Sequence, residues 1–327
     1  MFEDVQSFGF LGLTVYKYGL FLSLGTALWL LAAWFLAPQK GIPGGTVLLT
    51  GVLAIPLGLL FARITYCLIS LAYYLDTIGQ PIAMLYFWDG GLSMMGALLG
   101  VSLAALIVAK AKKVHYGRLM DVLAVSAGAF LAVARLGEAF TTLGRGKTIN
   151  AAWMRDSAFF GIRETWSEDV FHAVFRYEAA IAVLFLVVMV CLFLGKKTRA
   201  AALPGDLALV FGALFGSAQV VLESLRDDGH LLWGFVRASQ VISILLPVAA
   251  IAVFSVQLIR REGMGWRPVA AWLAAAGSIA VAIVKEFDID TSNNLFREYL
   301  IMSLAMVALA AVVLLLWRRA KDQRQRM

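Results

Sequence analysis

The sequence is poor in charged residues. Asp, Glu, Lys and Arg together make up 15% of the 327 residues, whereas hydrophobic residues make up 61%. Soluble globular domains carry about 25% charged residues, so this scarcity excludes an ordinary soluble domain. No polar stretch longer than about 30 residues is left to form a soluble domain of its own. The composition is typical of a protein that crosses a membrane several times.

Cysteine and histidine are also scarce. Cys67 and Cys191 are the only cysteines, and both lie in apolar stretches far apart in the sequence. His115, His172 and His230 are too scattered for their spacing to indicate a metal site. The P-loop, the dinucleotide-binding glycine motif in its strand–helix context and the GxSxG motif are absent as well. We therefore expect no metal site and no bound cofactor.

Long apolar stretches are abundant. Nine of them, each about 17–25 residues long, can cross the ~30 Å hydrocarbon core of a bilayer as helices. Their centres lie near residues 27, 57, 99, 129, 183, 214, 247, 276 and 308. The first starts at Tyr16 and lacks a basic leading segment and a small-residue cleavage site, so we expect it to be retained. The sequence predicts an all-α polytopic membrane protein with nine transmembrane helices.

The distribution of basic residues predicts the orientation. The loops after the first, third, fifth and seventh stretches, together with the C-terminal segment, hold more than half of the 28 Lys and Arg residues. Because basic residues gather on the cytoplasmic side, we expect the C-terminus inside and the N-terminus outside. The basic clusters then set topology, and we expect no nucleic-acid partner. The longest polar loop, about residues 141–170, would form a small extracytoplasmic head.

Two of the apolar stretches carry an arginine with a carboxylate three residues away. Arg135 precedes Glu138, and Glu223 precedes Arg226, with Gln219 one helical turn earlier on the same face. A charged side chain inside a membrane costs several kcal/mol, so such residues face a protein interior and mark functional sites. We expect all five to converge on one polar chamber in the outer half of the membrane. The alternative is that each pair neutralises itself as a structural ion pair.

A glycine-rich segment runs from Trp88 to Gly100. It contains two adjacent glycines, Gly90 and Gly91, followed by Ser93 and Gly96. Such a segment is typical of a close-packed seam between membrane helices. It also leaves backbone N–H groups available at a helix start, where a ligand can approach closely. Together with its neighbours, the segment resembles the corresponding motif of the prolipoprotein diacylglyceryl transferase family.

The resemblance extends from about residue 8 to residue 260, with the motifs in the same order. The further matching segments are Val15–Leu20, Ala62–Arg63, Ala134–Gly137, His172–Glu178, Phe211–Arg226 and Ser239–Gln240. It implies a seven-helix family-like membrane domain over residues 1–262. Residues 263–327 would add a transmembrane hairpin and a basic cytoplasmic tail. We expect that hairpin to carry no interior charge and to pack at the periphery.

The resemblance also implies a reaction. The family transfers the diacylglyceryl group of phosphatidylglycerol to the lipobox cysteine thiol of a preprolipoprotein, in the bacterial cytoplasmic (plasma) membrane, and releases glycerol phosphate. The implied catalytic residues are Arg135, Glu138, Glu223, Arg226 and His172. The implied substrate-binding residues are Tyr18, Arg63, Gly90, Gly91, Ser93, Gly96, Tyr177, Glu178, Gln219 and Arg237.

The chain departs from the family pattern at several motif positions. Met95 replaces the motif histidine, Met94 a phenylalanine and Ala97 a glycine, while Glu138 replaces an asparagine and Gln219 an arginine. Methionine cannot take a proton and glutamine brings no positive charge. Nearby residues would therefore have to replace the lost proton acceptor and the lost cation. The candidates are Glu138 or His172 for the proton and Arg237 for the charge. The departures leave two alternatives open: a phospholipid-using transferase with another acceptor, and a non-catalytic paralogue that binds lipid or lipoprotein.

Overall fold

Long helices make up most of the protein. The structure is a computed structural model, and it describes residues 6–87, 90–163, 168–228, 231–233, 236–289, 291–292 and 294–325. In this part of the chain, nine helices are long and apolar enough to cross a membrane. The predicted all-α polytopic membrane fold is therefore confirmed. The helices are α2 (Lys17–Leu36), α3 (Gly44–Ile69), α4 (Met94–Ala111), α5 (Tyr116–Gly137), α7 (Val174–Leu194), α9 (Asp206–Leu225), α10 (Ala238–Glu262), α11 (Trp266–Ile289) and α12 (Leu295–Gln325).

Short elements connect the long helices. A hairpin of β1 (Ser7–Phe10) and β2 (Leu13–Tyr16) precedes α2, and a pair of β6 (Leu232–Trp233) and β7 (Val236–Arg237) precedes α10. A three-stranded antiparallel sheet of order β3-β5-β4 lies between α5 and α7. Its strands are β3 (Arg145–Thr148), β4 (Gly161–Arg163) and β5 (Val170–Ala173), with the short helix α6 (Ala152–Arg155) between β3 and β4. The remaining short helices are η1 (Ala37–Lys40), η2 (Tyr73–Thr77), η3 (Pro81–Leu85), η5 (Glu138–Phe140) and α8 (Lys196–Ala201).

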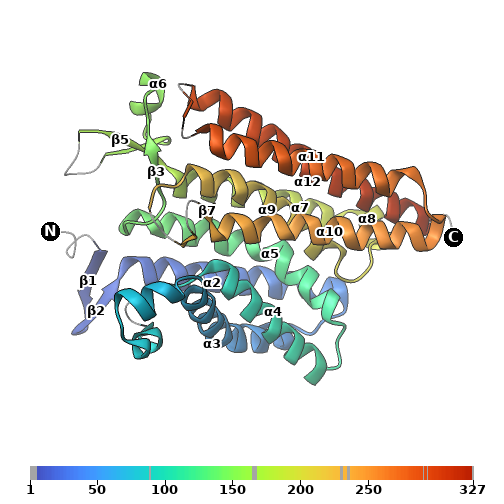
Figure 1. The fold of residues 1–327 in the computed structure, drawn as a ribbon. Helices are drawn as coiled ribbons and strands as arrows, with labels where there is room; N and C mark the ends of the chain where they lie inside the picture. Colours follow the sequence, from blue (N-terminus) through green and yellow to red (C-terminus); the bar gives the residue numbers. More distant parts are fainter. Residues whose placement is uncertain are drawn as a thin grey trace.

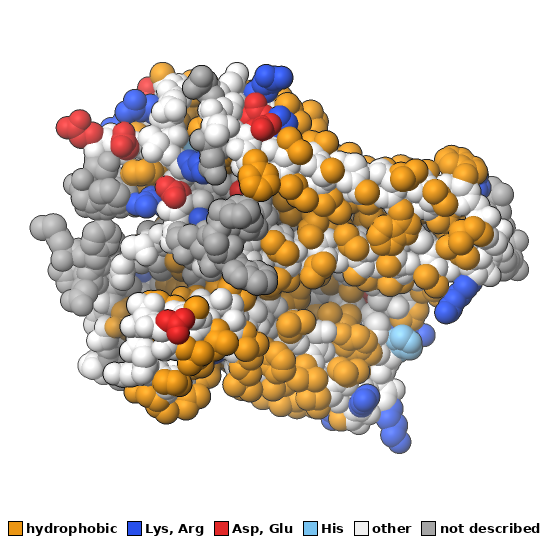
Figure 2. All heavy atoms as spheres, in the orientation of Figure 1, with side chains coloured by type: hydrophobic (Ala, Val, Ile, Leu, Met, Phe, Trp, Pro, Cys, Tyr) orange, Lys and Arg blue, Asp and Glu red, His pale blue; other side chains and the backbone are white. Residues whose placement is uncertain are grey.

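The strands and the C-terminus lie at opposite ends of the helical bundle. Figure 1 shows the β1–β2 hairpin and the β3-β5-β4 sheet at one end, with the C-terminus at the other. On the face in Figure 2, hydrophobic side chains cover the long middle of the molecule, and charged side chains gather towards its two ends. That distribution fits a bundle that spans an apolar layer. The orientation in the membrane, with the C-terminus inside and the head outside, stays a prediction.

Helices α5 and α9 lie at the centre of the bundle. Each is buried over most of its length, whereas α2 and α7 expose most of theirs. Helix α5 packs against α2, α7 and α9, and α9 packs in addition against α10 and α12. Polar side chains on α5 and α9 can therefore face protein rather than lipid. This central position is what permits ionised groups in these two helices.

Glycines hold α3 and α4 together. A Cβ atom at Gly96 would overlap the backbone oxygen of Phe61, and one at Gly100 would overlap that of Leu57. Ser93 begins α4, and its Oγ accepts a hydrogen bond of 3.3 Å from the N–H of Gly96. These contacts support the interpretation of the glycine-rich segment as a helix-packing seam. Trp88 and Asp89, at the start of that segment, lie outside the described residues.

The C-terminal hairpin packs along one side of the bundle. Helix α12 lies against α9 and α10, and α11 packs mainly on α12 (Figure 1). The expectation that the hairpin carries no interior charge is wrong, because Glu298 at the start of α12 is only 5% exposed. Lys285 of α11 neutralises it, with its Nζ 2.7 Å from Glu298 Oε2. The ion pair between Lys285 and Glu298 thus permits a buried carboxylate in a hairpin that was expected to be apolar inside.

Candidate functional site

Arg135 and its first partner come from the end of α5. The helix ends at Gly137, and Glu138 follows in η5, so both side chains project from the same helix end. The Nη1 atom of Arg135 lies 2.5 Å from Glu138 Oε1. Its Nε atom lies 3.3 Å from Oε2 of Glu178, in the second turn of α7. Arg135 therefore binds two carboxylates that come from different parts of the fold.

Arg226 reaches the same two carboxylates from α9. It directly follows α9, which ends at Leu225, and its backbone is extended. Its guanidinium lies 3.3 Å from Glu178 Oε2 and 3.6 Å from Glu138 Oε2. All four side chains are buried. The predicted convergence of Arg135 and Arg226 is confirmed, since the two arginines share Glu138 and Glu178.

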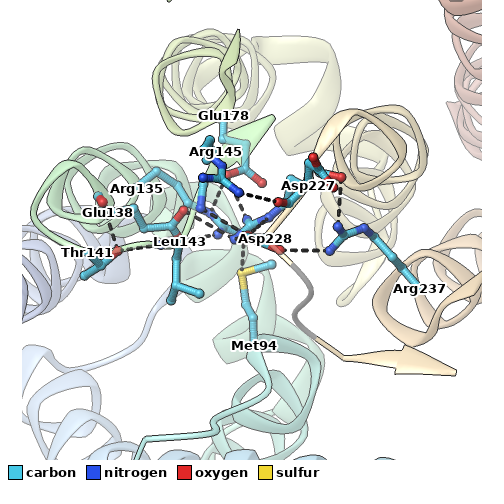
Figure 3. A network of polar contacts seen from close by, with 12 residues as sticks. Met94, Arg135, Glu138, Thr141, Leu143, Arg145, Glu178, Asp227, Asp228 and Arg237 are labelled. Carbon is cyan, nitrogen blue, oxygen red and sulfur yellow. Dashed lines mark hydrogen bonds and ion pairs between the residues drawn. The ribbon is translucent and has the colours of Figure 1, made fainter. Parts of the chain in front are cut away.

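Asp228 extends this ion-pair cluster towards α10. Its Oδ2 lies 2.6 Å from Nη2 of Arg226, and its Oδ1 lies 2.9 Å from Nη1 of Arg237. Arg237 also donates a hydrogen bond of 2.8 Å to the backbone oxygen of Arg226. Burial alone would raise the pKa of Asp228, but Arg226 and Arg237 outweigh it and hold that pKa well below its ordinary value. Asp228 therefore stays ionised and binds both arginines. Figure 3 shows its contact with Arg237.

The head loop closes over the cluster. The backbone N–H of Gly144 donates to Asp228 Oδ2 at 3.1 Å, and that of Asp227 donates to the oxygen of Arg145 at 2.9 Å. Gly144 has a positive φ of 73°, and a Cβ atom there would lie 2.5 Å from Glu138 Oε2. Only glycine fits this close approach without displacing the carboxylate. The segment that leads into β3 is thus fixed directly on the ionised groups.

A cavity with apolar walls lies beside the cluster, between α5, α7 and α9. Arg135, Glu178 and Gln219 supply its polar side. The other lining residues are Leu131, Ile181, Ala182, Phe185, Phe215, Ala218 and Leu222. Gln219 is 3% exposed, and its Oε1 has no hydrogen-bond partner among the described residues. The cavity, with about 10 Å³ of free space, therefore places an amide oxygen that can accept a hydrogen bond beside apolar side chains.

Tyr18, Glu223 and Met94 also lie at the cluster. The ring of Tyr18, in the first turn of α2, packs against Gly137, and Glu223 is buried close enough to act electrostatically on both arginines. Met94 Sδ lies 3.2 Å from Nη2 of Arg135 (Figure 3). Neither Met94 nor Asp228 is among the site residues that the sequence motifs predicted. For Asp228 the available signal was its place two residues after a candidate arginine.

His172 and Tyr177 belong to the head rather than to the ion-pair cluster. His172 Nδ1 lies 2.9 Å from the Tyr177 hydroxyl, which donates a hydrogen bond of 2.8 Å to the backbone oxygen of Phe160. The Tyr177 ring also packs against Phe159 and Phe160. Burial lowers the pKa of His172, which favours the neutral imidazole. Of the predicted residues between His172 and Glu178, the structure brings Glu178 alone into the cluster.

Arg63 lies in a different region and has backbone partners. Its guanidinium donates to the backbone oxygens of Ala83 and Met84, each at 2.9 Å, and of Gly91 at 3.2 Å. It also donates to the oxygen of Gly90. Both glycines have positive φ values, which lets their carbonyls turn towards Arg63. These contacts indicate a structural role for Arg63, Gly90 and Gly91, and substrate binding by them stays a prediction.

Comparison with known proteins identifies the family. The family described as prolipoprotein diacylglyceryl transferase matches residues 6–256. A Bacillus licheniformis protein is 27% identical over 246 residues, which cover 74% of this chain and 88% of that protein. Proteins of Halalkalibacterium halodurans and Listeria welshimeri are each 27% identical over 244 residues, covering 74% of this chain and 82% and 85% of their own lengths. All three are named phosphatidylglycerol–prolipoprotein diacylglyceryl transferase. With its family motifs in order and its two central arginines together, the chain belongs to the prolipoprotein diacylglyceryl transferase family.

Proposed function

We propose that this protein transfers the diacylglyceryl group of phosphatidylglycerol to the lipobox cysteine thiol of a preprolipoprotein. The observation that carries the proposal is the meeting of Arg135 and Arg226 beside an apolar-walled cavity. The two guanidinium groups suit a phosphodiester headgroup, because each can donate paired hydrogen bonds to phosphate oxygens. The family membership and the relatives' names support the same reaction. We place the protein in the bacterial cytoplasmic membrane, with the head on the outer face.

The two arginines would act on the leaving group. The thiolate sulfur attacks the glyceryl carbon that is esterified to phosphate, and a carbon–sulfur bond forms. The carbon–oxygen bond breaks, and its electron pair stays on the phosphate oxygen, so glycerol phosphate leaves with one additional negative charge. Arg135 and Arg226 hold that phosphate and stabilise the developing charge, which is worth most in a water-poor site.

Glu138 is the proposed acceptor of the thiol proton. Its Oε2 is buried and has no hydrogen-bond partner among the described residues, although Arg226 lies 3.6 Å away. A phosphate that occupies the guanidinium groups leaves this carboxylate without its ion-pair partners, next to the reacting atoms. His172 is the weaker candidate because its Nδ1 lies against the Tyr177 hydroxyl in the head. Met95, at the position of the motif histidine, packs in the hydrophobic core.

Glu178, Glu223, Gln219, Asp228 and Arg237 have supporting roles in this proposal. Glu178 lies between the two arginines and contacts both, and Asp228 together with Arg237 fixes the far side of Arg226. Gln219 offers its unpaired Oε1 to a hydroxyl of the lipid headgroup. Arg237 binds Asp228 and the backbone oxygen of Arg226, so its contacts lie beside Arg226 rather than at Gln219.

A reconstituted assay tests the proposal. Purified full-length protein in vesicles that contain labelled phosphatidylglycerol is mixed with a lipobox peptide, and the thioether product and glycerol phosphate are measured. A peptide with serine in place of the lipobox cysteine is the control. Both products are expected with the cysteine peptide alone. Glycerol phosphate without a thioether would indicate another acceptor, and lipid binding without either product would indicate a non-catalytic protein.

A further inference from the structure

The C-terminal hairpin touches the helix that carries Glu223 and Arg226. The Tyr299 hydroxyl, in the second turn of α12, donates a hydrogen bond of 3.0 Å to the backbone oxygen of Ser224. Ser224 directly follows Glu223 and lies in the last turn of α9. The family match ends at residue 256, so this contact comes from a part of the chain beyond the matched region.

The contact caps one further carbonyl group at the end of α9, that of Ser224. The last carbonyl groups of a helix have no partners inside the helix and must find them elsewhere. The N–H of Arg226 lies 3.2 Å from the oxygen of Leu222 and 3.3 Å from that of Glu223. The next carbonyl, that of Ser224, is taken by Tyr299. The geometry of the last turn, from which Glu223 and Arg226 project, therefore depends on a side chain of the hairpin.

A second link runs through α10. Gln240 Nε2 donates to Glu286 Oε2 of α11 at 2.9 Å and to the backbone oxygen of Val220 in α9 at 3.1 Å. Val220 lies one turn before Ser224 on α9. The hairpin thus contacts the end of α9 directly through Tyr299 and indirectly through Glu286 and Gln240.

The two linking residues are part of one fixed tip. Lys285 Nζ lies 2.7 Å from Glu298 Oε2 and 2.6 Å from Asp288 Oδ2. Lys285 directly precedes Glu286, and Glu298 directly precedes Tyr299. The ion pair between Lys285 and Glu298 therefore fixes α11 and α12 to each other at the level of the two contacts. Figure 1 shows the two helices side by side along the bundle.

We propose that the hairpin tip is a brace for the active site, with Tyr299 and Glu286 as positioning residues for Glu223 and Arg226. The inference rests on the proposed transferase function. A guanidinium that stabilises developing charge must be placed to within about 1 Å, and small displacements lower the rate of the chemical step. Neither residue touches the substrate, so loss of the brace lowers kcat and leaves KM for the lipid nearly unchanged.

The test uses conservative side-chain substitutions in the full-length protein. Tyr299→Phe removes the hydroxyl and keeps the ring, Glu286→Leu removes the acceptor, and Glu286→Gln keeps one. Tyr116→Phe is the matched control, because its hydroxyl lies 2.6 Å from Ser102 Oγ, far along the bundle from the cluster. We expect kcat to fall about fivefold in Tyr299→Phe and Glu286→Leu, the effect of one hydrogen bond on a rate. Glu286→Gln and Tyr116→Phe are expected to keep kcat within about twofold.

Hydrogen exchange gives a second readout that needs no activity. Tyr299→Phe is expected to speed exchange of the backbone amides of residues 222–226, and Tyr116→Phe is expected not to. If the wild type forms no thioether, the proposed function fails, and the exchange data still decide whether the hairpin fixes α9. Unchanged kcat and unchanged exchange in Tyr299→Phe would overturn the brace. A loss of kcat in Tyr116→Phe equal to that in Tyr299→Phe would also overturn the brace. A fall in kcat that follows the fall in Tm across all four variants would do the same.

Discussion

Two regions of this protein bury arginine in membrane-spanning helices, and the partners of the arginines differ. On α3, Arg63 donates to backbone carbonyls of the segment that leads into α4. At the ends of α5 and α9, Arg135 and Arg226 bind the side-chain carboxylates of Glu138 and Glu178. Backbone carbonyls are part of the chain and cannot give way to a ligand. Carboxylate side chains can turn aside, so an anionic headgroup can replace them.

Both arrangements satisfy a buried cation, so burial alone does not distinguish structure from function. What distinguishes them is whether the partners are exchangeable, and whether polar atoms remain unpaired. Glu138 Oε2, Glu178 Oε1 and Gln219 Oε1 are buried without hydrogen-bond partners among the described residues, and all three lie at the α5–α9 region. A buried oxygen without a hydrogen bond lowers the stability of the fold, and such atoms are often found at active sites.

The largest expected effect comes from removing an exchangeable arginine. Arg135→Ala should lower thioether formation by ~1000-fold or more, because it removes a cation from the leaving phosphate and leaves Glu138 and Glu178 less compensated. The measurement is the initial rate of peptide lipidation in vesicles. Arg135→Lys is the control, because lysine keeps the positive charge but lacks the planar guanidinium group. It should recover only a small part of the rate. Activity of Arg135→Ala within tenfold of wild type would remove the distinction between the two regions.

Glu138→Gln tests the proposed proton acceptor. The substitution keeps the size of the side chain and removes its capacity to accept the thiol proton, so transfer should fall ~100-fold. Adding Met95→His to this variant should raise the rate again, because histidine at that position can take a proton. Met95→His alone should leave the rate unchanged or higher. Equal rates for Glu138→Gln and wild type would shift the assignment to His172, which His172→Gln then tests.

Arg63→Ala should act on stability rather than on chemistry. The backbone oxygens of Ala83, Met84, Gly90 and Gly91 lose their donor, which should cost about 3 kcal/mol of folding free energy. Thermal unfolding in detergent measures the loss, and activity is normalised to the folded fraction. That normalised rate should stay within a few-fold of wild type. A normalised loss as large as that of Arg135→Ala would show that Arg63 also acts on the substrate.

The smallest expected effect concerns His172. Burial lowers its pKa from the ordinary 6.5, so the unfolded chain binds more protons than the folded one just below that pH. The stability contributed by the neutral imidazole is thus complete above about pH 6.5 and is lost as the pH falls towards the folded pKa. His172→Gln should flatten the dependence of Tm on pH between about 5 and 7. An unchanged pH dependence would mean that another group controls stability in this range.

The sequence predicted the helices well and the cluster in part. Apolar stretches long enough to span a bilayer are a local property, and all nine correspond to helices in the described part of the chain. The spacing of Arg135 and Glu138 predicted that both side chains share one face, and they contact each other at the end of α5. The same spacing misled for Arg226, because α9 ends at Leu225 and the arginine leaves the helix to bind Glu138, Glu178 and Asp228. Contacts between helices depend on packing, which helical periodicity does not encode.

The hairpin shows the same limit. Lys285 and Glu298 read as charges at the ends of two apolar helices, and nothing in their spacing indicated a buried ion pair. No motif singled out Tyr299, yet its hydroxyl contacts the last turn of α9. Such contacts require the position of one helix relative to another, and a single sequence does not provide it.

The carboxylates shared by Arg135 and Arg226 also bear on turnover. In the proposed reaction, glycerol phosphate gains a negative charge beside Glu178, and beside Glu138 once that group has released the thiol proton. Like charges at short range in a water-poor site repel strongly, and the carboxylates compete with the product for the same guanidinium groups. Product dissociation is therefore favoured by the same carboxylates that pair with the two arginines. A tightly retained product would otherwise limit the rate of each new cycle.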